Sequence, residues 1–275
     1  MTRRAMLGGM GCGLAMPGLA GCGARQAAYR RPDSAQAPAR PAPSGLDAVI
    51  DISHMVDVSD FGLARRHSDI EAVIHKSSEG GDWFDPSYGA RRAQAEAAGM
   101  LWGAYHYGTR QYSGADQAAA FLSAAQPGPS TLLALDFELN DRNPRNTMTL
   151  AQAETFVLAV QQATGRLPMV YVHPNWANGV PPPGHSASLA QPIMPGSILA
   201  RCELWLADYR DEPEVPMAWA DRGWRLWQYV ANESPADAAY GTVPRAVQGI
   251  SHCDRNLFAG SSSDLNRFWR SGRMA

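Results

Sequence analysis

Two acidic side chains, Asp136 and Glu138, stand two residues apart in the apolar segment TLLALDFEL, residues 131–139. Alternate side chains of a β-strand point to opposite faces, so both acids share one face with Ala134. At roughly 3.3 Å per residue the two carboxyl groups lie about 6 to 7 Å apart, and each raises the proton affinity of the other. One of them is therefore expected to stay protonated near neutral pH while the other is ionised.

A protonated carboxyl group beside an ionised one is the pair that breaks a glycosidic bond. The acid protonates the leaving oxygen, and the anion stabilises the oxocarbenium-like charge of the transition state. Glu138 and Asp136 fit these two roles. Two other interpretations of the pair stay open from the residues alone, namely ion pairing with arginines at a cleft and metal binding.

Metal binding has weaker support. The sequence has no HExxH motif and no closely spaced set of histidines and cysteines beside the acids. Four histidines are scattered singly, which is typical of packing or hydrogen-bonding residues: His54, His75, His106 and His173. We therefore predict a site with no metal and no cofactor.

Aromatic side chains recur at the ends of other apolar runs. Sugar rings pack on the faces of such side chains, whose polar tips hydrogen-bond the sugar hydroxyl groups. A single aromatic residue belongs more often to a core, but the grouping at several strand ends favours a carbohydrate groove. The predicted substrate-binding residues are Tyr105, Tyr107, Tyr171, Trp205, Tyr209, Trp227 and Tyr229.

The order of the apolar runs predicts the fold. Short runs typical of strands begin near residues 47, 71, 101, 131, 168, 203 and 225, and alanine-rich helical segments lie between the early ones. This alternation predicts parallel strands with crossover helices, closed into an α/β barrel. Such barrels keep their chemistry at the carboxyl ends of the strands, where Asp136 and Glu138 fall. The proline- and glycine-rich segment at 174–196 predicts an incomplete helical shell in the second half.

Residues 1–21 are typical of an export signal. Arg3 and Arg4 precede a stretch of small and apolar residues too short for a stable transmembrane helix, which needs roughly 20 apolar residues. The order Leu, Ala, Gly, Cys at 19–22 resembles a bacterial lipobox, which implies cleavage before Cys22 and attachment of lipid to its thiol. An ordinary signal peptide with an incidental cysteine is the alternative.

The proline-rich residues 22–45 predict an extended tether, which leaves 46–275 as one folded domain. We expect an exported, membrane-anchored lipoprotein that faces the periplasm or the cell exterior and acts as a monomer. The net charge of −2 gives no indication of a nucleic-acid partner. An oxidising compartment would permit a disulfide between Cys202 and Cys253, and two buried free thiols are the alternative.

Several motifs occur in a fixed order along the chain: DISH at 51–54, KSSEG at 76–80, LDFE at 135–138, WLADY at 205–209, WQY at 227–229 and CDRNLF at 253–258. Together they resemble the glycoside hydrolase family 25 muramidases, the Cellosyl-type lysozymes. The resemblance spans residues 47–258. It implies a modified TIM-like (β/α)5β3 barrel that cuts peptidoglycan glycan strands between N-acetylmuramic acid and N-acetylglucosamine.

The resemblance also implies roles for individual acids. Glu138 becomes the proton donor, and Asp136 becomes either the nucleophile or the anion that orients the 2-acetamido group of the substrate. Asp51 and Asp254 fall on the two further acidic positions of the family. Asp208, in WLADY, points away from the barrel centre by strand alternation and is not counted as catalytic.

Two other functions are kept as hypotheses. A non-catalytic, peptidoglycan-binding lipoprotein would use the groove for adhesion, although a binder has no need for four acids in one groove. A related barrel glycosidase acting on chitin-like polymers would carry the same acids and differ in its substrate.

Overall fold

The structure, a computed structural model, describes residues 45–210, 212–231 and 246–271. These residues belong to one compact unit, Pro41–Ala275. The predicted export signal, the lipid attachment at Cys22 and nearly all of the tether lie outside the described residues. Within the described part, no helix has both the length and the apolar character needed to cross a bilayer.

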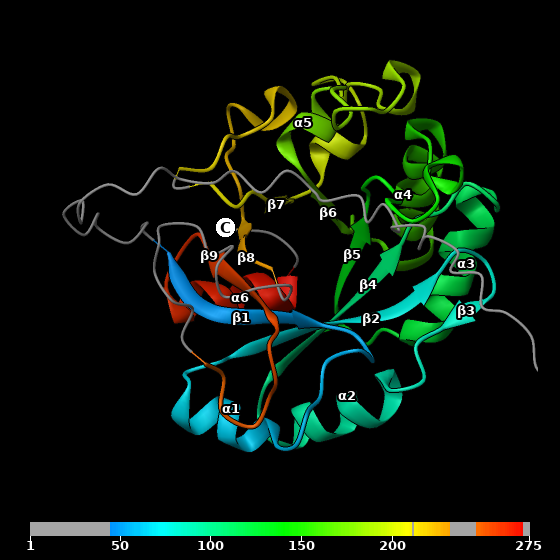
Figure 1. The fold of residues 1–275 in the computed structure, drawn as a ribbon. Coiled ribbons are helices and arrows are strands. Elements are labelled where there is room, and N and C mark those ends of the chain that lie inside the picture. The colour runs from blue at the N-terminus through cyan, green and yellow to red at the C-terminus, as the bar shows by residue number, and fades with distance from the viewer. Residues whose placement is uncertain (1–44, 211, 232–245, 272–275) are drawn as a thin grey trace, which may run out of the picture. The chain divides into compact units, whose positions relative to one another are not determined.

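Among the described residues, nine strands form one sheet, and eight of them close into a barrel because β1 pairs with both β2 and β9 (Figure 1). The two-residue strand β3 lies outside the barrel and pairs antiparallel with the end of β2. The strands are β1 (Leu46–Ile52), β2 (Ala72–Glu79), β3 (Trp83–Phe84), β4 (Leu101–Tyr107), β5 (Leu132–Asp136), β6 (Met169–Val172), β7 (Leu204–Ala207), β8 (Leu226–Val230) and β9 (Asp254–Phe258).

Neighbouring strands from β1 round to β8 pair in parallel, whereas β9 pairs antiparallel with both β1 and β8. The carboxyl ends of the parallel strands therefore meet the start of β9 at one end of the barrel, which we call the mouth. In the register of β1 and β9, Asp51 is the partner of Asp254. The reversed last strand thus brings an acid at its beginning to the same end as the acids that close β1 and β5.

Helices cover the first half of the barrel and thin out in the second, as the sequence predicts. A capping box between Thr149 and Gln152 begins α4, and Gly165 ends it in the left-handed conformation at φ 72°, where a side chain would be strained. After β6 there is only a four-residue helix before short 3-10 turns. The helices are α1 (Phe61–His67), α2 (Tyr88–Ala97), α3 (Gly114–Ala125), α4 (Leu150–Thr164), α5 (Pro174–Ala177) and α6 (Ser262–Ser271).

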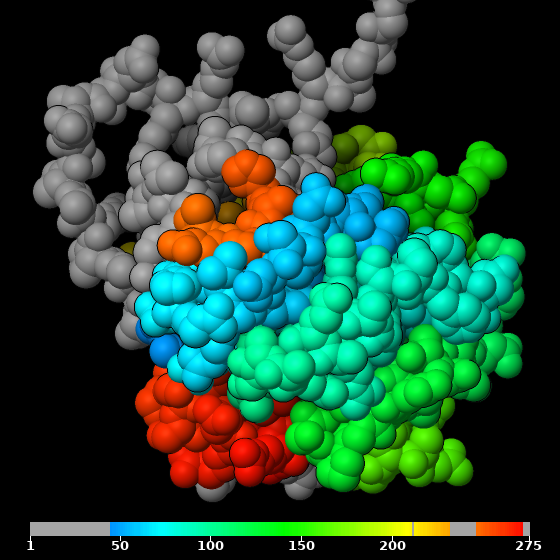
Figure 2. All heavy atoms as spheres, turned by 90° about the horizontal axis from the view of Figure 1, so that it is seen from below, coloured from blue at the N-terminus to red at the C-terminus, as the bar shows by residue number. Residues whose placement is uncertain are grey.

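The barrel wall separates two apolar cores. The outer core lies between strands and helices and contains Leu133, Leu135 and Phe137. The inner core lies inside the barrel and contains Ala134 and Trp205, together with side chains of α6. Helix α6 fills the base of the barrel: its Trp269 is fully buried and donates a 2.8 Å hydrogen bond to the carbonyl of Trp102 on β4. Figure 2 shows α6 (red) beside α1 and α2 on one face of the molecule.

The two domain cysteines are free and buried, so the predicted disulfide is not formed and the alternative, two buried thiols, is what the structure has. Cys202 lies just before β7, at the end of the barrel opposite the mouth. Cys253 lies just before β9, which runs the other way, and therefore sits at the mouth. The antiparallel last strand separates two sulfurs that must approach to about 2 Å to be joined.

Candidate active site

The strand β5 directs its acids into the barrel. Ala134 belongs to the inner core, while Leu133, Leu135 and Phe137 belong to the outer core. Asp136 ends the strand on the inner face, and Glu138 follows it at the mouth, where it is half-buried. The backbone of Phe137 still donates a 3.0 Å hydrogen bond to the carbonyl of Tyr171, so the extended geometry continues past the end of β5.

The four predicted acids share one electrostatic environment. The buried phenol of Tyr105 on β4 has its pKa raised well above its ordinary value, first by burial and then by the charges of Asp136, Asp51, Asp254 and Glu138. In the strand order, β2 and β4 lie between β1 and β5, so the acids face one another across the barrel. The structure therefore brings together the four acids that the sequence singled out.

Asp136 is held in a site that disfavours its charge. Burial raises its pKa well above the ordinary value, and the charges of Glu138, Asp51 and Glu79 raise it further, while Lys76 opposes them. Its buried Oδ1 has no hydrogen-bond partner among the described residues. A carboxylate with an unsatisfied oxygen in such a site binds a proton readily, which is the behaviour expected of one member of an acid–base pair.

Asp51 is held by two side-chain amides. Nε2 of Gln228 donates to both of its oxygens at 3.1 Å, and Nδ2 of Asn256 donates at 2.8 Å. Burial raises the pKa of Asp51, and the hydrogen bonds to Asn256, Gln228 and Asp254 oppose that shift. The amides therefore fix the carboxyl group in place and offset part of the cost of ionising it.

Each amide is in turn oriented by aromatic side chains. Oε1 of Gln228 accepts hydrogen bonds from the hydroxyls of Tyr171 (2.8 Å) and Tyr209 (2.6 Å). Oδ1 of Asn256 accepts one from Nε1 of Trp205 at 2.6 Å. Because hydroxyl and indole donors leave only the amide NH2 groups to face Asp51, the orientation of both amides is settled by their neighbours.

Replacing Gln228 with leucine tests this network. The change keeps a similar size but leaves Asp51 with fewer donors and both tyrosine hydroxyls without their acceptor, so we expect a loss of about 2–4 kcal/mol in the free energy of unfolding. Tyr209→Phe removes a single, partly exposed bond and should cost about 0.5–1.5 kcal/mol. Urea denaturation of the two variants measures both losses, and equal losses would contradict a central role for the amide.

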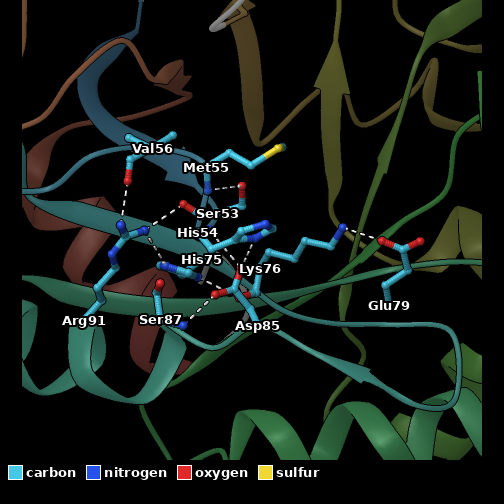
Figure 3. A network of polar contacts seen from close by, with 10 residues as sticks. All are labelled: Ser53, His54, Met55, Val56, His75, Lys76, Glu79, Asp85, Ser87 and Arg91. Atoms are coloured by element: carbon cyan, nitrogen blue, oxygen red, sulfur yellow. Dashed lines mark hydrogen bonds and ion pairs between the residues drawn. The ribbon is translucent and has the colours of Figure 1, made fainter. Parts of the chain in front are cut away.

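A second network fixes the loop after β1 (Figure 3). Asp85 Oδ2 accepts hydrogen bonds from the backbone N–H of His54 (2.9 Å) and pairs with its Nδ1 (3.0 Å). Arg91 on α2 donates to the carbonyls of Ser53 (2.7 Å) and Val56 (2.6 Å). These bonds anchor the chain just beyond Asp51, so the carboxyl group at the end of β1 rests on a held loop.

Lys76 lies beside the acids and was not predicted as a site residue. Its Nζ pairs with Glu79 at 2.7 Å and lies over the rings of Tyr107 (4.8 Å) and Trp83 (5.0 Å). It also lowers the pKa of Asp136. The ring contacts and the ion pair hold a positive charge near Asp136, which helps that carboxyl group to ionise.

Most of the predicted aromatic residues line the barrel interior or its mouth, but two do not. Tyr105 packs against the inner core, which also contains Tyr171 and Trp205. Tyr107 lies against Lys76, and Tyr209 keeps 38% of its surface exposed. The prediction is wrong in placement for Trp227 and Tyr229, which belong to the outer core.

The prediction for β8 assigned Trp227 and Tyr229 to the inner face of the strand, whereas they lie on its outer face. Trp227 donates its Nε1 hydrogen to the carbonyl of Asp208 and packs under the outer layer, so Gln228 between the two aromatics faces inward. The alternation of the WQY motif gives two faces but not which one is inside. Two features of the sequence could have indicated the amides that bind Asp51. One is a glutamine, Gln228, between large apolar residues, and the other is Asn256, two residues after Asp254.

Two of the four predicted histidines, His75 and His106, pack against aromatic rings. His106 packs on Phe156 at 5.0 Å, and burial lowers its pKa to about 3. His75 packs against Trp102 at 5.6 Å, and burial lowers its pKa to about 4. Both stay neutral at ordinary pH. Among the described residues, no group of three or more histidine, cysteine and acidic side chains is arranged to hold a metal ion.

Comparisons with known proteins bear on the family and the fold. The profile of glycosyl hydrolases family 25 matches residues 50–238. The bacterial lysozyme from Streptomyces coelicolor is 25% identical with a TM-score of 0.67, covering 84% of this chain and 100% of that chain. The muramidase from Acremonium alcalophilum is also 25% identical, with a TM-score of 0.58, covering 82% and 98%.

The family GH25 lysozyme from Aspergillus fumigatus, at 23% identity and a TM-score of 0.58, covers 80% of this chain and 97% of its own and supports the fold alone. A comparison with the curated proteins finds no match. The matched range covers more than half of this chain and includes Asp51, Asp136 and Glu138. The chain therefore belongs to glycosyl hydrolase family 25 and is a glycoside hydrolase with a TIM-like barrel.

Proposed function

We propose that this glycoside hydrolase is an N-acetylmuramidase that hydrolyses the β-1,4 bond between N-acetylmuramic acid and N-acetylglucosamine in peptidoglycan. The observation that carries the proposal is the inward pair of Asp136 and Glu138, in which burial and the neighbouring charge raise the pKa of Asp136. The similar structures include a bacterial lysozyme and a fungal muramidase. Their activity supports the choice of substrate.

In the proposed mechanism Glu138 is the acid and then the base. Its proton passes to the glycosidic oxygen as the bond from that oxygen to C1 breaks, and the leaving sugar departs with a free hydroxyl. A water molecule later adds to C1 and returns a proton to Glu138. Glu138 suits this work because it sits half-buried at the mouth, within reach of both substrate and solvent.

Asp136 supplies negative charge to the same step. The pair shares one proton, which passes from Asp136 to Glu138 and on to the leaving oxygen, so Asp136 is ionised as positive charge develops at C1. It acts either as the nucleophile or as the anion that orients the 2-acetamido group. Asp51 and Asp254 hold water or sugar hydroxyls on the opposite wall. Tyr107 and Tyr209 provide ring faces for the sugars.

Analysis of the products tests this function. The enzyme is expected to release fragments of purified peptidoglycan whose new reducing end is N-acetylmuramic acid, identified by mass spectrometry. New N-acetylglucosamine ends would assign the other bond and refute the muramidase proposal. Faster cleavage of chitooligosaccharides would favour the chitin-like alternative, and sedimentation with wall fragments without turnover would favour the adhesion alternative.

We also propose that the enzyme is exported and anchored through lipid on Cys22. The lipobox-like order at residues 19–22 supports the proposal. Labelling of producing cells with radioactive palmitate should mark the wild-type chain and leave a Cys22→Ala variant unmarked. Equal labelling of the two chains would contradict the anchor.

A further inference from the structure

The end of the barrel opposite the mouth carries a concentration of arginines. A cavity of about 600 Å³ lies there, between the beginnings of β5, β6 and β7 and the end of α6. Its charged lining residues are Arg166, Arg201, Glu203 and Arg222. We call this set, together with the neighbouring Arg225, the basal arginine cluster.

Ion pairs and carbonyl contacts hold the cluster in shape. Arg222 donates a 2.8 Å hydrogen bond to the carbonyl of Ala200 and pairs with Glu203 at 3.2 Å. Glu203 also pairs with Arg225 at 3.2 Å. Since one carboxylate is shared between two arginines, the cluster keeps a positive net charge. The side chain of Arg222 is 40% exposed, and Arg201 is exposed as well, so both present charge to solvent.

The folded domain begins at this same end. Strand β1 runs parallel to β2 and starts at Leu46, so the preceding tether joins the barrel at its base. A Cβ placed on Gly45 would lie 3.5 Å from the ring of Trp224, which stands between Arg222 and Arg225 in the chain. Gly45, where the described domain begins, therefore lies next to the basal arginine cluster.

The acidic site and the basal arginine cluster lie at opposite ends of the barrel. Asp51, Asp136, Glu138 and Asp254 gather at the mouth, and the basal arginine cluster occupies the opposite end. A surface of anionic phospholipid attracts basic side chains and repels acidic ones. Such a surface would attract the basal arginine cluster and therefore contact the domain at the base of the barrel.

We propose that the base of the barrel is a docking surface for an anionic phospholipid bilayer, with headgroup phosphates engaging Arg201 and Arg222. Docking in this orientation turns the mouth away from the bilayer and toward the wall. Gly45, the first described residue, lies beside the cluster, and the proposed lipid anchor at Cys22 precedes it in the sequence, which favours a membrane over a soluble anionic polymer as the occupant. The inference goes beyond the muramidase proposal and does not depend on which bond is cut.

Vesicle binding tests the docking surface. The chain from residue 41 onward, one compact unit without Cys22, is mixed with phosphatidylcholine vesicles that contain or lack phosphatidylglycerol. We expect binding only to the vesicles with phosphatidylglycerol. Arg201→Gln/Arg222→Gln should weaken that binding about thirtyfold, the equivalent of about 2 kcal/mol for two arginines. Release of sugar from soluble wall fragments should stay unchanged, because the cluster lies far from the acids.

A matched double variant controls for net charge. Arg142→Gln/Arg145→Gln changes the charge equally in the loop after β5, at the mouth, and should leave vesicle binding unaltered. Equal weakening by both double variants, or equal binding to both kinds of vesicle, would overturn the proposal. Binding of a soluble teichoic acid through Arg201 and Arg222 without binding to vesicles would also overturn it. Loss of wall hydrolysis with vesicle binding intact would refute the muramidase proposal instead.

Discussion

Glu138→Gln is expected to lower kcat/KM on peptidoglycan by about 10³-fold, with the loss almost entirely in kcat. The amide keeps the size of the side chain, but its N–H groups are far too weakly acidic to protonate the glycosidic oxygen. General acid–base groups typically contribute 10²–10⁴-fold, so we expect about 10³. Because Glu138 is half-buried at the mouth, the change should leave the fold intact. Steady-state rates of reducing-sugar release, with circular dichroism as a check on folding, measure the effect.

A second glutamate supplies the control. Glu96 on α2 pairs with Arg92 at 2.9 Å, and its side chain is 49% exposed on the helical shell. Glu96→Gln makes the same chemical change away from the mouth and should leave kcat/KM within about twofold, since isolated surface ion pairs contribute little. A Glu138→Gln enzyme that keeps more than about a tenth of the wild-type kcat would contradict its role as the acid.

Asp136→Asn should lower kcat by about 10²–10³-fold and at the same time raise stability at neutral pH. The activity falls because the neutral amide cannot stabilise positive charge at C1. Stability rises because the neutral amide avoids the cost that the wild type bears, namely a buried carboxyl group whose Oδ1 has no hydrogen-bond partner among the described residues. We expect a gain of about 1 kcal/mol, or roughly 2–4 °C in Tm for a domain of this size.

The stability effect has a definite dependence on pH. The pKa of Asp136 is raised in the folded state above the ordinary 3.8, so the folded protein binds this proton more tightly than the unfolded chain. The resulting stabilisation is complete below 3.8 and is lost as pH rises through the folded-state pKa. The Tm of the Asn variant should therefore exceed the wild-type Tm at neutral pH and approach it in acid.

A second buried aspartate should respond in the opposite direction. Asp208 is 1% exposed, but Arg210 donates to its two oxygens from Nε at 2.9 Å and from Nη2 at 2.7 Å. Asp208→Asn breaks this pairing and should cost about 1–3 kcal/mol while sparing kcat. If Asp136→Asn destabilises the protein as Asp208→Asn does, the destabilising effect assigned to the buried carboxyl group of Asp136 is wrong.

Local periodicity was enough to predict the main features of the barrel. The two-residue repeat of an extended chain put Asp136 and Glu138 on the face of Ala134, and the structure has that face inside. The alternation of strands and alanine-rich helices predicted parallel strands, and the proline-rich segment after β6 predicted the thin shell of the second half. These features follow from backbone geometry and turn chemistry, which act over a few residues.

Periodicity does not say which of two faces is buried in the barrel. On β8 the aromatic pair Trp227 and Tyr229 packs outward, and Gln228 points inward to Asp51. The polar partners of Gln228 come from β6 and from the segment after β7, through Tyr171 and Tyr209. A hydrogen-bond network joined from such distant segments exists only once the barrel has closed.

The sequence by itself determined which residues are acids at strand ends, because the order of residues along a strand fixes their spacing and their face. The tertiary structure decided which of those strand ends lie together at the mouth of the barrel. The reversal of β9 brings Asp254 beside Asp51 and carries Cys253 to the opposite end from Cys202. Strand direction depends on how the whole sheet pairs, and no short stretch of sequence encodes that pairing.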